Sequence, residues 1–155
     1  MPKTLLLLAL LLTSCIDFPN QYAPSRLRQA DTGPNPRGLK SYIDMKDASA
    51  ISQCAWGVSP SAFDGEKRKA AAKAAIRFLV ANSAGNKLSV DFVSPTLQSI
   101  RFKVNGRLVG QLNAEGPTHF ETPVAASDFV SGTATLLELD SDSGIGILRA
   151  GFLRQ

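Results

Sequence analysis

Short runs in which apolar and polar residues alternate dominate the chain after about residue 39. In 87–93, Leu88, Val90 and Phe92 alternate with polar residues, which is the period of a half-buried strand. Strands are predicted over 41–45, 74–80, 87–93, 99–104, 107–112, 119–124, 134–140 and 145–153. Because they recur about every ten residues between turns rich in Gly, Asn, Pro and Ser, we predict an all-β antiparallel sandwich of about seven or eight strands.

The clearest local signal is the hairpin "IRFKVNGRLVGQL". Its first strand, 99–104, alternates strictly, and Asn105-Gly106 follows as a two-residue connection. That dipeptide suits a type I′ turn, in which both central residues take positive φ. The returning strand is expected to place Leu108, and by the same alternation Leu112, in the core.

The segment 65–82 gives two conflicting signals. It is rich in Ala and Lys, and by propensity alone it would form a helix. Alternate positions from Ala74 to Val80 nevertheless form one apolar face of a strand. We therefore predict a strand over 74–80 and leave 66–73 as a loop or a single helical turn.

The amino terminus carries an apolar run too short to span a membrane. Eight apolar residues, 5–12, follow Lys3, whereas a spanning helix needs about 20. A positive start, a short apolar stretch and small residues at its end are typical of a secretory signal. Residues 1–14 are therefore predicted to be a signal peptide.

The end of that signal, Leu12-Thr13-Ser14-Cys15, resembles the lipobox of bacterial lipoproteins. The resemblance implies cleavage before Cys15 and acylation of Cys15, so that several acyl chains attach the protein to a membrane. An ordinary signal with an incidental cysteine is the alternative. In such lipoproteins an aspartate directly after the cysteine favours the inner membrane; here Ile16 stands there, which favours the outer membrane of a bacterial envelope.

Residues 15–38 are predicted to be a flexible, lipid-anchored linker, and 39–155 the sandwich domain. The linker has four prolines and two glycines without any apolar period. The whole chain is 44 % hydrophobic and 19 % charged, as in a folded domain, and its net charge of +4 is too small to indicate nucleic-acid binding. With Cys15 lipidated, Cys54 has no partner in the chain, and a buried, inert thiol is expected.

The residues do not favour catalysis. His119 is the only histidine, and its place in an alternating strand predicts a surface position. No Gly-x-Ser-x-Gly, phosphate-binding loop or Cys-x-x-Cys occurs. The acidic run 140–144 resembles part of a calcium loop but lacks its later ligands, so a solvated turn is favoured. We predict a protein that is not an enzyme and that holds no cofactor or metal.

The order of motifs from about 40 to 155 resembles the galactose-binding-like jelly roll, and more narrowly the sandwich domains appended to bacterial envelope glycosyltransferases and phosphoglycerol transferases. The matching positions are Trp56-Gly57, Asp64-Gly65, Val104-Asn105-Gly106 and Asp142 with Ile145-Gly146-Ile147-Leu148. Two positions differ from that family: Glu66-Lys67-Arg68 replaces an aromatic after Gly65, and no arginine precedes the last strand.

Two functions follow as hypotheses. The first is a non-catalytic structural or assembly partner, anchored in the envelope, that contacts another protein through a strand edge or loop. The alternative is a tethered glycan-binding module, because sugar sites combine an aromatic face with hydrogen-bonding side chains. The candidate cluster is Trp56 with Asp64, Glu66 and Arg68, although Trp56 also fits a core position.

Overall fold

The computed structural model describes residues 38–130 and 133–154 of the chain. The described elements are β1 (Tyr42–Asp44), η1 (Ala48–Gln53), β2 (Cys54–Phe63), β3 (Arg68–Phe78), β4 (Asn86–Val104), β5 (Arg107–Val124), η2 (Ala126–Asp128), β6 (Thr135–Ser141) and β7 (Ile145–Arg154). None of the helices in this described part is long and apolar enough to cross a membrane. The predicted signal peptide, Cys15 and nearly all of the predicted linker lie outside it.

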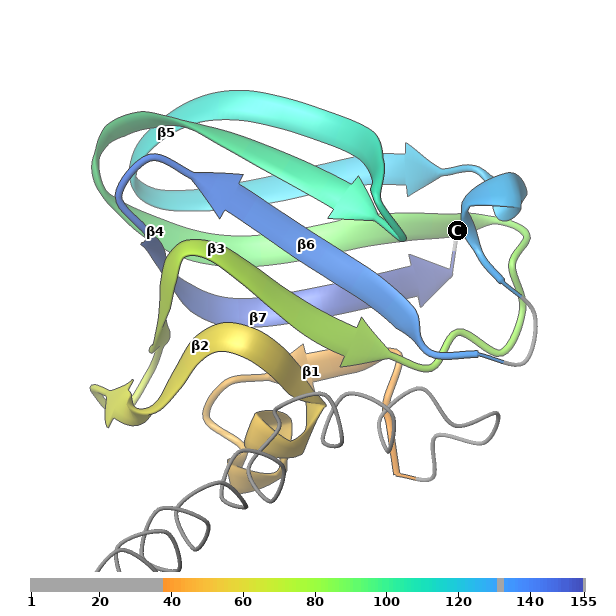
Figure 1. The fold of residues 1–155 in the computed structure, drawn as a ribbon, viewed down its shortest axis with the longest axis horizontal. Helices are drawn as coiled ribbons and strands as arrows, with labels where there is room; N and C mark the ends of the chain where they lie inside the picture. Colours follow the sequence, from red (N-terminus) through yellow and green to blue (C-terminus); the bar gives the residue numbers. More distant parts are fainter. Residues whose placement is uncertain (1–37, 131–132, 155) are drawn as a thin grey trace, which may run out of the picture. The chain divides into compact units, whose positions relative to one another are not determined.

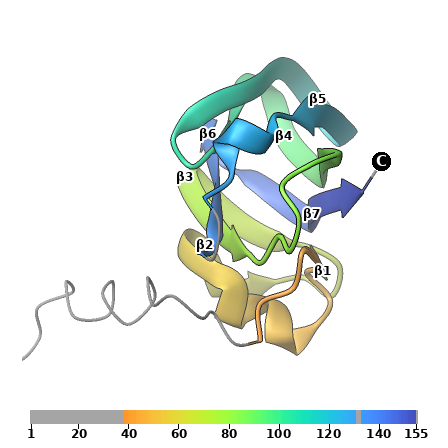
Figure 2. The same ribbon diagram turned by 90° about the vertical axis from the view of Figure 1, so that its right-hand side faces the viewer.

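The seven described strands form an antiparallel jelly-roll sandwich, which confirms the predicted fold class. One sheet contains the second half of β5, the first half of β4, then β7 and β1. The other contains the first half of β5, the second half of β4, then β6, β3 and β2. β4 and β5 thus cross from one sheet to the other, and β5 curves back along the top of the domain in Figure 1. β1 and β2 lie at the side away from β5 (Figure 2).

Two pairs of predicted strands are each one long strand. The predicted 87–93 and 99–104 both belong to β4, and 107–112 and 119–124 both belong to β5. The residues between them are where the two strands bend: the pairing passes from Ser94↔Gly116 to Gln98↔Ala114 across an irregularity. Proline and glycine in these stretches indicated chain breaks, but here they accompany the bends that carry a strand between sheets.

The prediction for 66–73 was wrong. β3 begins at Arg68, so most of this stretch is strand, and its start pairs with β7. Ala70, Ala74 and Ala75 are fully buried, and the bare backbone of glycines packs closely against this strand. A Cβ on Gly144, for example, would overlap the carbonyl oxygen of Ala70. Sheet pairing and burial therefore override helix propensity.

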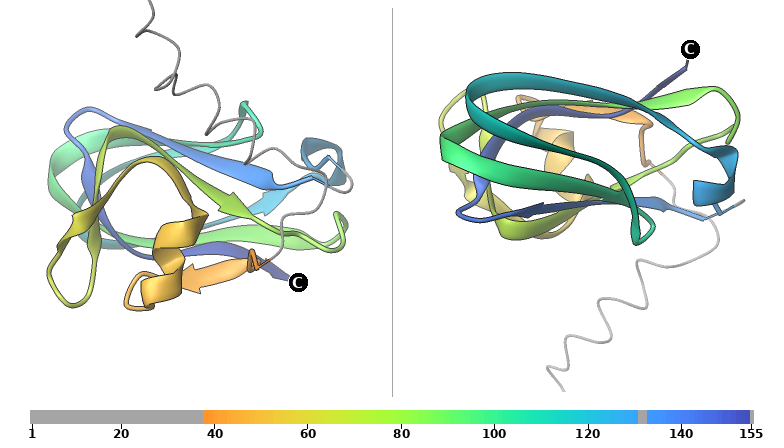
Figure 3. Two further views of the ribbon diagram at one scale, coloured as in Figure 1. Left: turned by 60° about the horizontal axis from the view of Figure 1, so that its bottom comes forward. Right: turned by 90° about the horizontal axis from the view of Figure 1, so that it is seen from above.

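β2 was not among the predicted strands. Among the described strands it is an edge strand that pairs only with β3, and its register shifts three times. These irregularities remove the simple alternation that reveals a strand in sequence. η1 precedes it and lies beside β1 in Figure 3. Gln53 in η1 is buried and its amide bonds to the backbone of Lys40 and Arg77.

The β4–β5 turn has the predicted form. Asn105 and Gly106 have φ values of 49° and 84°, as a type I′ turn requires. The Asn105 side chain also donates to the Asp128 carbonyl at 2.7 Å and accepts from the Leu136 N–H at 2.9 Å. The turn is therefore linked to two later segments of the chain.

The inward position predicted for Leu108 was wrong. Leu108 is 57 % exposed, because the pairing passes from Lys103↔Leu108 to Phe102↔Gly110 and so inserts one extra residue in β5. This bulge reverses the inside–outside alternation before it, and Leu108 shares the outer face with Lys103. Leu112, beyond the bulge, packs against the core as expected.

Stacked aromatic rings fill the space between the sheets. Phe102 of β4 and Phe120 of β5 stack with ring centroids 4.3 Å apart, and Phe78 meets Phe152 edge-on at 5.5 Å. A Cβ on Gly110 would overlap the Phe120 ring. The bare backbone of Gly110 therefore lets the second half of β5 close over the first half.

Candidate functional site

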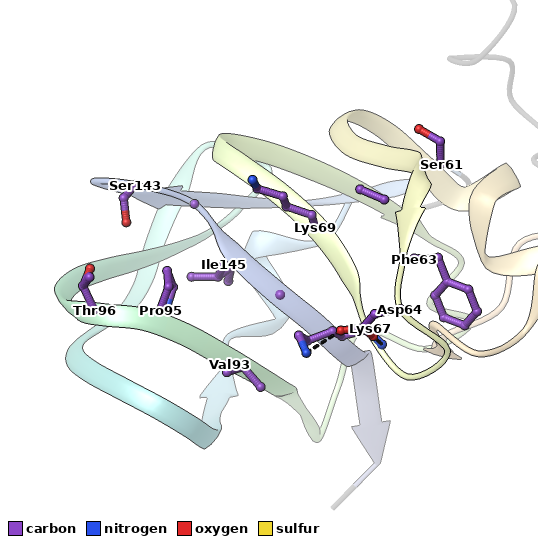
Figure 4. Close-up of a pocket in the computed structure, with 13 residues that line it drawn as sticks. Ser61, Phe63, Asp64, Lys67, Lys69, Val93, Pro95, Thr96, Ser143 and Ile145 are labelled. Carbon is purple, nitrogen blue, oxygen red and sulfur yellow. Dashed lines mark hydrogen bonds and ion pairs between the residues drawn. The ribbon is translucent and has the colours of Figure 1, made fainter.

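An open cleft of about 640 Å³ lies where the β2–β3 turn, the bend in β4 and the β6–β7 turn meet. Its walls are mainly apolar, with polar side chains at intervals around them (Figure 4). The lining residues are Ser61, Ala62, Phe63, Asp64, Lys67, Lys69, Val93, Pro95, Thr96, Ser143, Gly144, Ile145 and Gly146. These residues belong to three stretches that are far apart in the sequence.

The first wall is the β2–β3 turn, built around Asp64 and Gly65. The Asp64 carboxylate accepts the backbone N–H groups of Glu66 and Lys67, at 3.2 and 3.0 Å. It also pairs with the Lys67 ammonium at 2.5 Å. The Lys67 side chain, followed by these N–H groups, lowers the pKa of Asp64 to about 2. The next residue, Gly65, has a φ of +93° that L side chains rarely adopt. The turn is therefore fixed by its own side chain and by glycine.

Phe63 is the aromatic residue of the cleft and is 38 % exposed. The Arg68 guanidinium carbon lies 4.5 Å from the Phe63 ring centroid, in cation–π contact. Arg68 itself is buried and donates to the Pro60 carbonyl at 3.0 Å. Arg68 thus covers one face of the ring, and the rest of Phe63 is partly exposed at the β2–β3 end of the cleft. In Figure 4 the ring lies on the side of Asp64 away from Pro95 and Ile145.

The opposite wall depends on the buried side chain of Gln98. Its Nε2 donates to Ser94 Oγ at 2.8 Å and to the Gly144 carbonyl at 3.0 Å. Its Oε1 accepts the Ser143 N–H at 2.8 Å and the Ser143 hydroxyl at 3.1 Å. One glutamine therefore joins the bend in β4 to the β6–β7 turn and fixes the distance between the two.

Two glycines shape this wall, and one of them, Gly146, lets the Lys67 side chain lie close to β7. Gly144 has a φ of +85°, which the β6–β7 turn requires. A Cβ on Gly146 would overlap the aliphatic stem of Lys67. The Lys67 stem consequently lies across bare backbone, and its ammonium reaches back to Asp64.

The structure divides the predicted cluster. Asp64 lines the cleft, and Arg68 lies beneath its aromatic residue. Glu66 is exposed next to the same turn, where its backbone N–H bonds to Asp64. Trp56 does not line the cleft: it lies on β2 opposite Ala75 and is 43 % exposed. The core position for Trp56 was therefore wrong.

Sequence reasoning missed Phe63 and Gln98. The signal for Phe63 is its place directly before Asp64-Gly65, on the other side of the glycine from the expected aromatic. The signal for Gln98 is its position in the alternation of the strand, because it lies two residues before Ile100 and so on the same inward face as Ile100 and Phe102. A polar residue on an inward position must satisfy its hydrogen bonds inside the fold.

The other predicted chemistry lies away from the cleft. His119 is exposed on β5, as predicted. Cys54 is half-buried; its thiol donates weakly to the Ala50 carbonyl at 3.4 Å, and burial raises its pKa. Within residues 38–130 and 133–154, no group of three or more His, Cys, Asp or Glu side chains could hold a metal ion.

Comparisons with known proteins give a likeness in structure alone. No protein-family model matches the sequence, and no curated protein matches it. CsCBM6-3 from Clostridium stercorarium, solved in complex with cellobiose, is 9 % identical, with a TM-score of 0.49 over 77 % of this chain and 99 % of that chain. The carbohydrate-binding module CBM36, in complex with calcium and xylotriose, is 18 % identical, with a TM-score of 0.44 over 72 % and 98 %.

A third similar structure is TmCBM27, a carbohydrate-binding module studied for specific mannan recognition. It is 11 % identical, with a TM-score of 0.48 over 76 % of this chain and 98 % of that chain. These likenesses concern the sandwich architecture, and no residue of the cleft is assigned from them.

Proposed function

We propose that the domain is a carbohydrate-binding module whose glycan binds in the cleft beside Phe63. The observation that carries this proposal is a partly exposed aromatic ring, packed on Arg68, at the β2–β3 end of an open cleft whose other walls carry polar groups. Sugar rings stack their apolar C–H faces on aromatic rings, and their hydroxyls need hydrogen-bonding side chains nearby. Asp64, Thr96 and Ser143 supply such groups.

The size and rigidity of the cleft support this function. A volume of about 640 Å³ lies within the ordinary range of small-molecule sites. Both walls are fixed before any ligand arrives, by the Asp64 turn on one side and by Gln98 on the other. A preformed site does not have to order its own loops on binding, which favours affinity for a flexible ligand such as an oligosaccharide.

The test is a screen of the full-length protein on a glycan array, followed by calorimetry on the best ligand. Phe63→Ala is expected to weaken binding about five- to thirtyfold, because the stacking of a sugar ring on an aromatic side chain and its burial contribute about 1–2 kcal/mol. The matched control is Trp56→Ala, an exposed aromatic of the same strand outside the cleft, which should leave affinity unchanged. Loss of binding in the control alone, or no glycan bound at all, would overturn the proposal.

We further propose that Cys15 carries the lipid that anchors this module in the bacterial envelope, with the outer membrane favoured. The lipobox-like stretch 12–15 supports the anchor and Ile16 supports the choice of membrane. Cys15→Ser should abolish incorporation of labelled palmitate and release the protein from membrane fractions. Unchanged sedimentation of that variant with membranes would contradict the anchor.

A second candidate is the assembly partner predicted from the sequence. The observation that favours it is Trp56, a large aromatic residue exposed on the edge strand β2. Exposed aromatics are enriched at protein interfaces, and edge strands can pair with another chain. Cross-linking in intact cells, with Trp56→Ala and Phe63→Ala compared, separates the two functions: loss of a cross-linked partner only in Trp56→Ala would favour assembly.

A further inference from the structure

The charges that line the cleft do not cancel. Three charged side chains line it: Asp64, Lys67 and Lys69. Asp64 and Lys67 form a close ion pair, and the lowered pKa of Asp64, about 2, keeps that carboxylate ionised at every physiological pH. These two charges neutralise each other and hold the turn. The remaining charge of the lining is the single positive charge of Lys69.

Lys69 is placed to offer that charge to a ligand. It lies on β3 opposite Gly146 of β7, and both residues line the cleft. In Figure 4 its ammonium nitrogen lies apart from the Asp64–Lys67 pair. Among the described residues Lys69 takes part in no ion pair. Glu66 and Asp142 neighbour lining residues in the sequence but do not themselves line the cleft.

From this imbalance we propose that the cleft selects acidic glycans, with Lys69 binding a carboxylate or sulfate group on the sugar; this rests on the glycan-binding function proposed above. A charge-assisted hydrogen bond from an ammonium to such an oxygen is stronger than a bond between neutral groups. The apolar walls, including Val93, Pro95 and Ile145, keep part of the water away and strengthen the attraction. A neutral glycan would cover Lys69 without giving its charge a partner.

The experiment uses matched pairs of polymers that differ only in charge. Pectate, alginate and hyaluronan are each compared with their carboxyl-reduced forms, and dextran sulfate with uncharged dextran, on the full-length protein in detergent. The proposal expects at least one acidic form to bind about five- to tenfold more tightly than its uncharged partner at low salt. The preference should decrease as salt is added. The carboxyl and sulfate arms distinguish the two sources of negative charge.

Variants assign the preference to one side chain. Lys69→Gln should reduce the preference for the acidic form to within about twofold, whereas Lys69→Arg should keep the preference. Lys73→Gln is the matched control, because Lys73 is exposed on the same strand and does not line the cleft. An equal loss in Lys73→Gln would overturn the assignment to the cleft.

The outcomes separate this inference from the function on which it rests. If uncharged forms bind as tightly as acidic ones, and Phe63→Ala weakens both, the acidic preference is overturned and the glycan-binding function stands. If no polymer of either kind binds, both fail. If acidic polymers bind in the Phe63→Ala variant as in the wild type, they bind outside the cleft, and the inference is again overturned.

Discussion

Two clusters of charged side chains, one at the cleft and one on the face of a sheet, differ in whether each charge has an ion-pair partner. At the cleft, Asp64 and Lys67 pair with each other, and Lys69 has no ion-pair partner among the described residues. On the outer face of the β1–β7–β4–β5 sheet, charges alternate in a chain. The members of this sheet-face network are Arg149, Asp91, His119, Glu121 and Lys87.

Every member of the sheet-face network has an ion-pair partner within the network, because the register of the strands places the members side by side. Asp91 is opposite His119 on one side and Arg149 on the other. Its carboxylate pairs with both, at 2.5 and 2.8 Å. Each charge in the network has an opposite partner, so a ligand would have to displace an existing pair. The two clusters thus differ in one physical respect: at the cleft the Lys69 charge beside apolar side chains has no ion-pair partner among the described residues, whereas in the sheet-face network every member has one.

The largest expected effect on stability is at Gln98, whose side chain holds one wall of the cleft in place. Gln98→Ala removes four hydrogen bonds and leaves the buried Gly144 carbonyl and Ser143 N–H without partners. A loss of about 2–4 kcal/mol in the free energy of unfolding is expected, measured by urea denaturation. The control is Gln111→Ala, whose exposed amide bonds only to Ser99 Oγ and should cost under about 0.5 kcal/mol. Equal effects would show that the wall does not depend on Gln98.

The sheet-face network is tested through His119. Its hydrogen bond with Asp91 raises the pKa of His119 above the ordinary value. A raised pKa stabilises the fold fully below the unfolded-state value near 6.5, and this contribution is lost as the pH rises through the folded-state pKa. The stability difference between wild type and His119→Gln should therefore be larger at pH 5.5 than at pH 8.5. Because the side chain is exposed, we expect a change under about 1 kcal/mol; a difference independent of pH would contradict the pairing.

The smallest effect concerns Asp64 in the cleft. Its pKa of about 2 lies below the ordinary 3.8, so its stabilising contribution is present above the ordinary value and is lost as the pH falls through about 2. An NMR titration of the Asp64 carboxyl carbon should have its midpoint near 2. In Lys67→Met the midpoint should move up toward 3.8, because the largest cause of the shift is removed. A midpoint near 3.8 in the wild type would show that the pair does not form.

The residues that sequence reasoning placed correctly share a local cause. The Asn105-Gly106 turn, the alternation of 87–93 and the exposed His119 follow from backbone preference and side-chain period, which neighbouring residues decide. The errors share a cause as well. The strand at 68–73, the continuous β4 and β5 and the exposed Leu108 depend on pairing partners and bulges distant in sequence.

The candidate site was predictable only in part. Asp64 was chosen from the Asp64-Gly65 turn, whose chemistry is local, and it does line the cleft. Trp56 was chosen as an aromatic residue with hydrogen-bonding side chains near it in the sequence, but nearness in sequence says nothing of where an irregular edge strand would place it. Phe63 had a weak local signal in its place before Asp64-Gly65, but its packing on Arg68, at the other end of the turn, is visible only in the structure.

The sequence by itself determined that this is an all-β domain, since alternation and turn residues act over a few positions and need no distant partner. Tertiary structure decided where a ligand could bind. The cleft draws its walls from 61–69, 93–96 and 143–146, and only the packing of two sheets brings these stretches together. The same packing left Lys69 beside an apolar hollow and gave every charge of the sheet-face network a partner, which no pattern along the chain records.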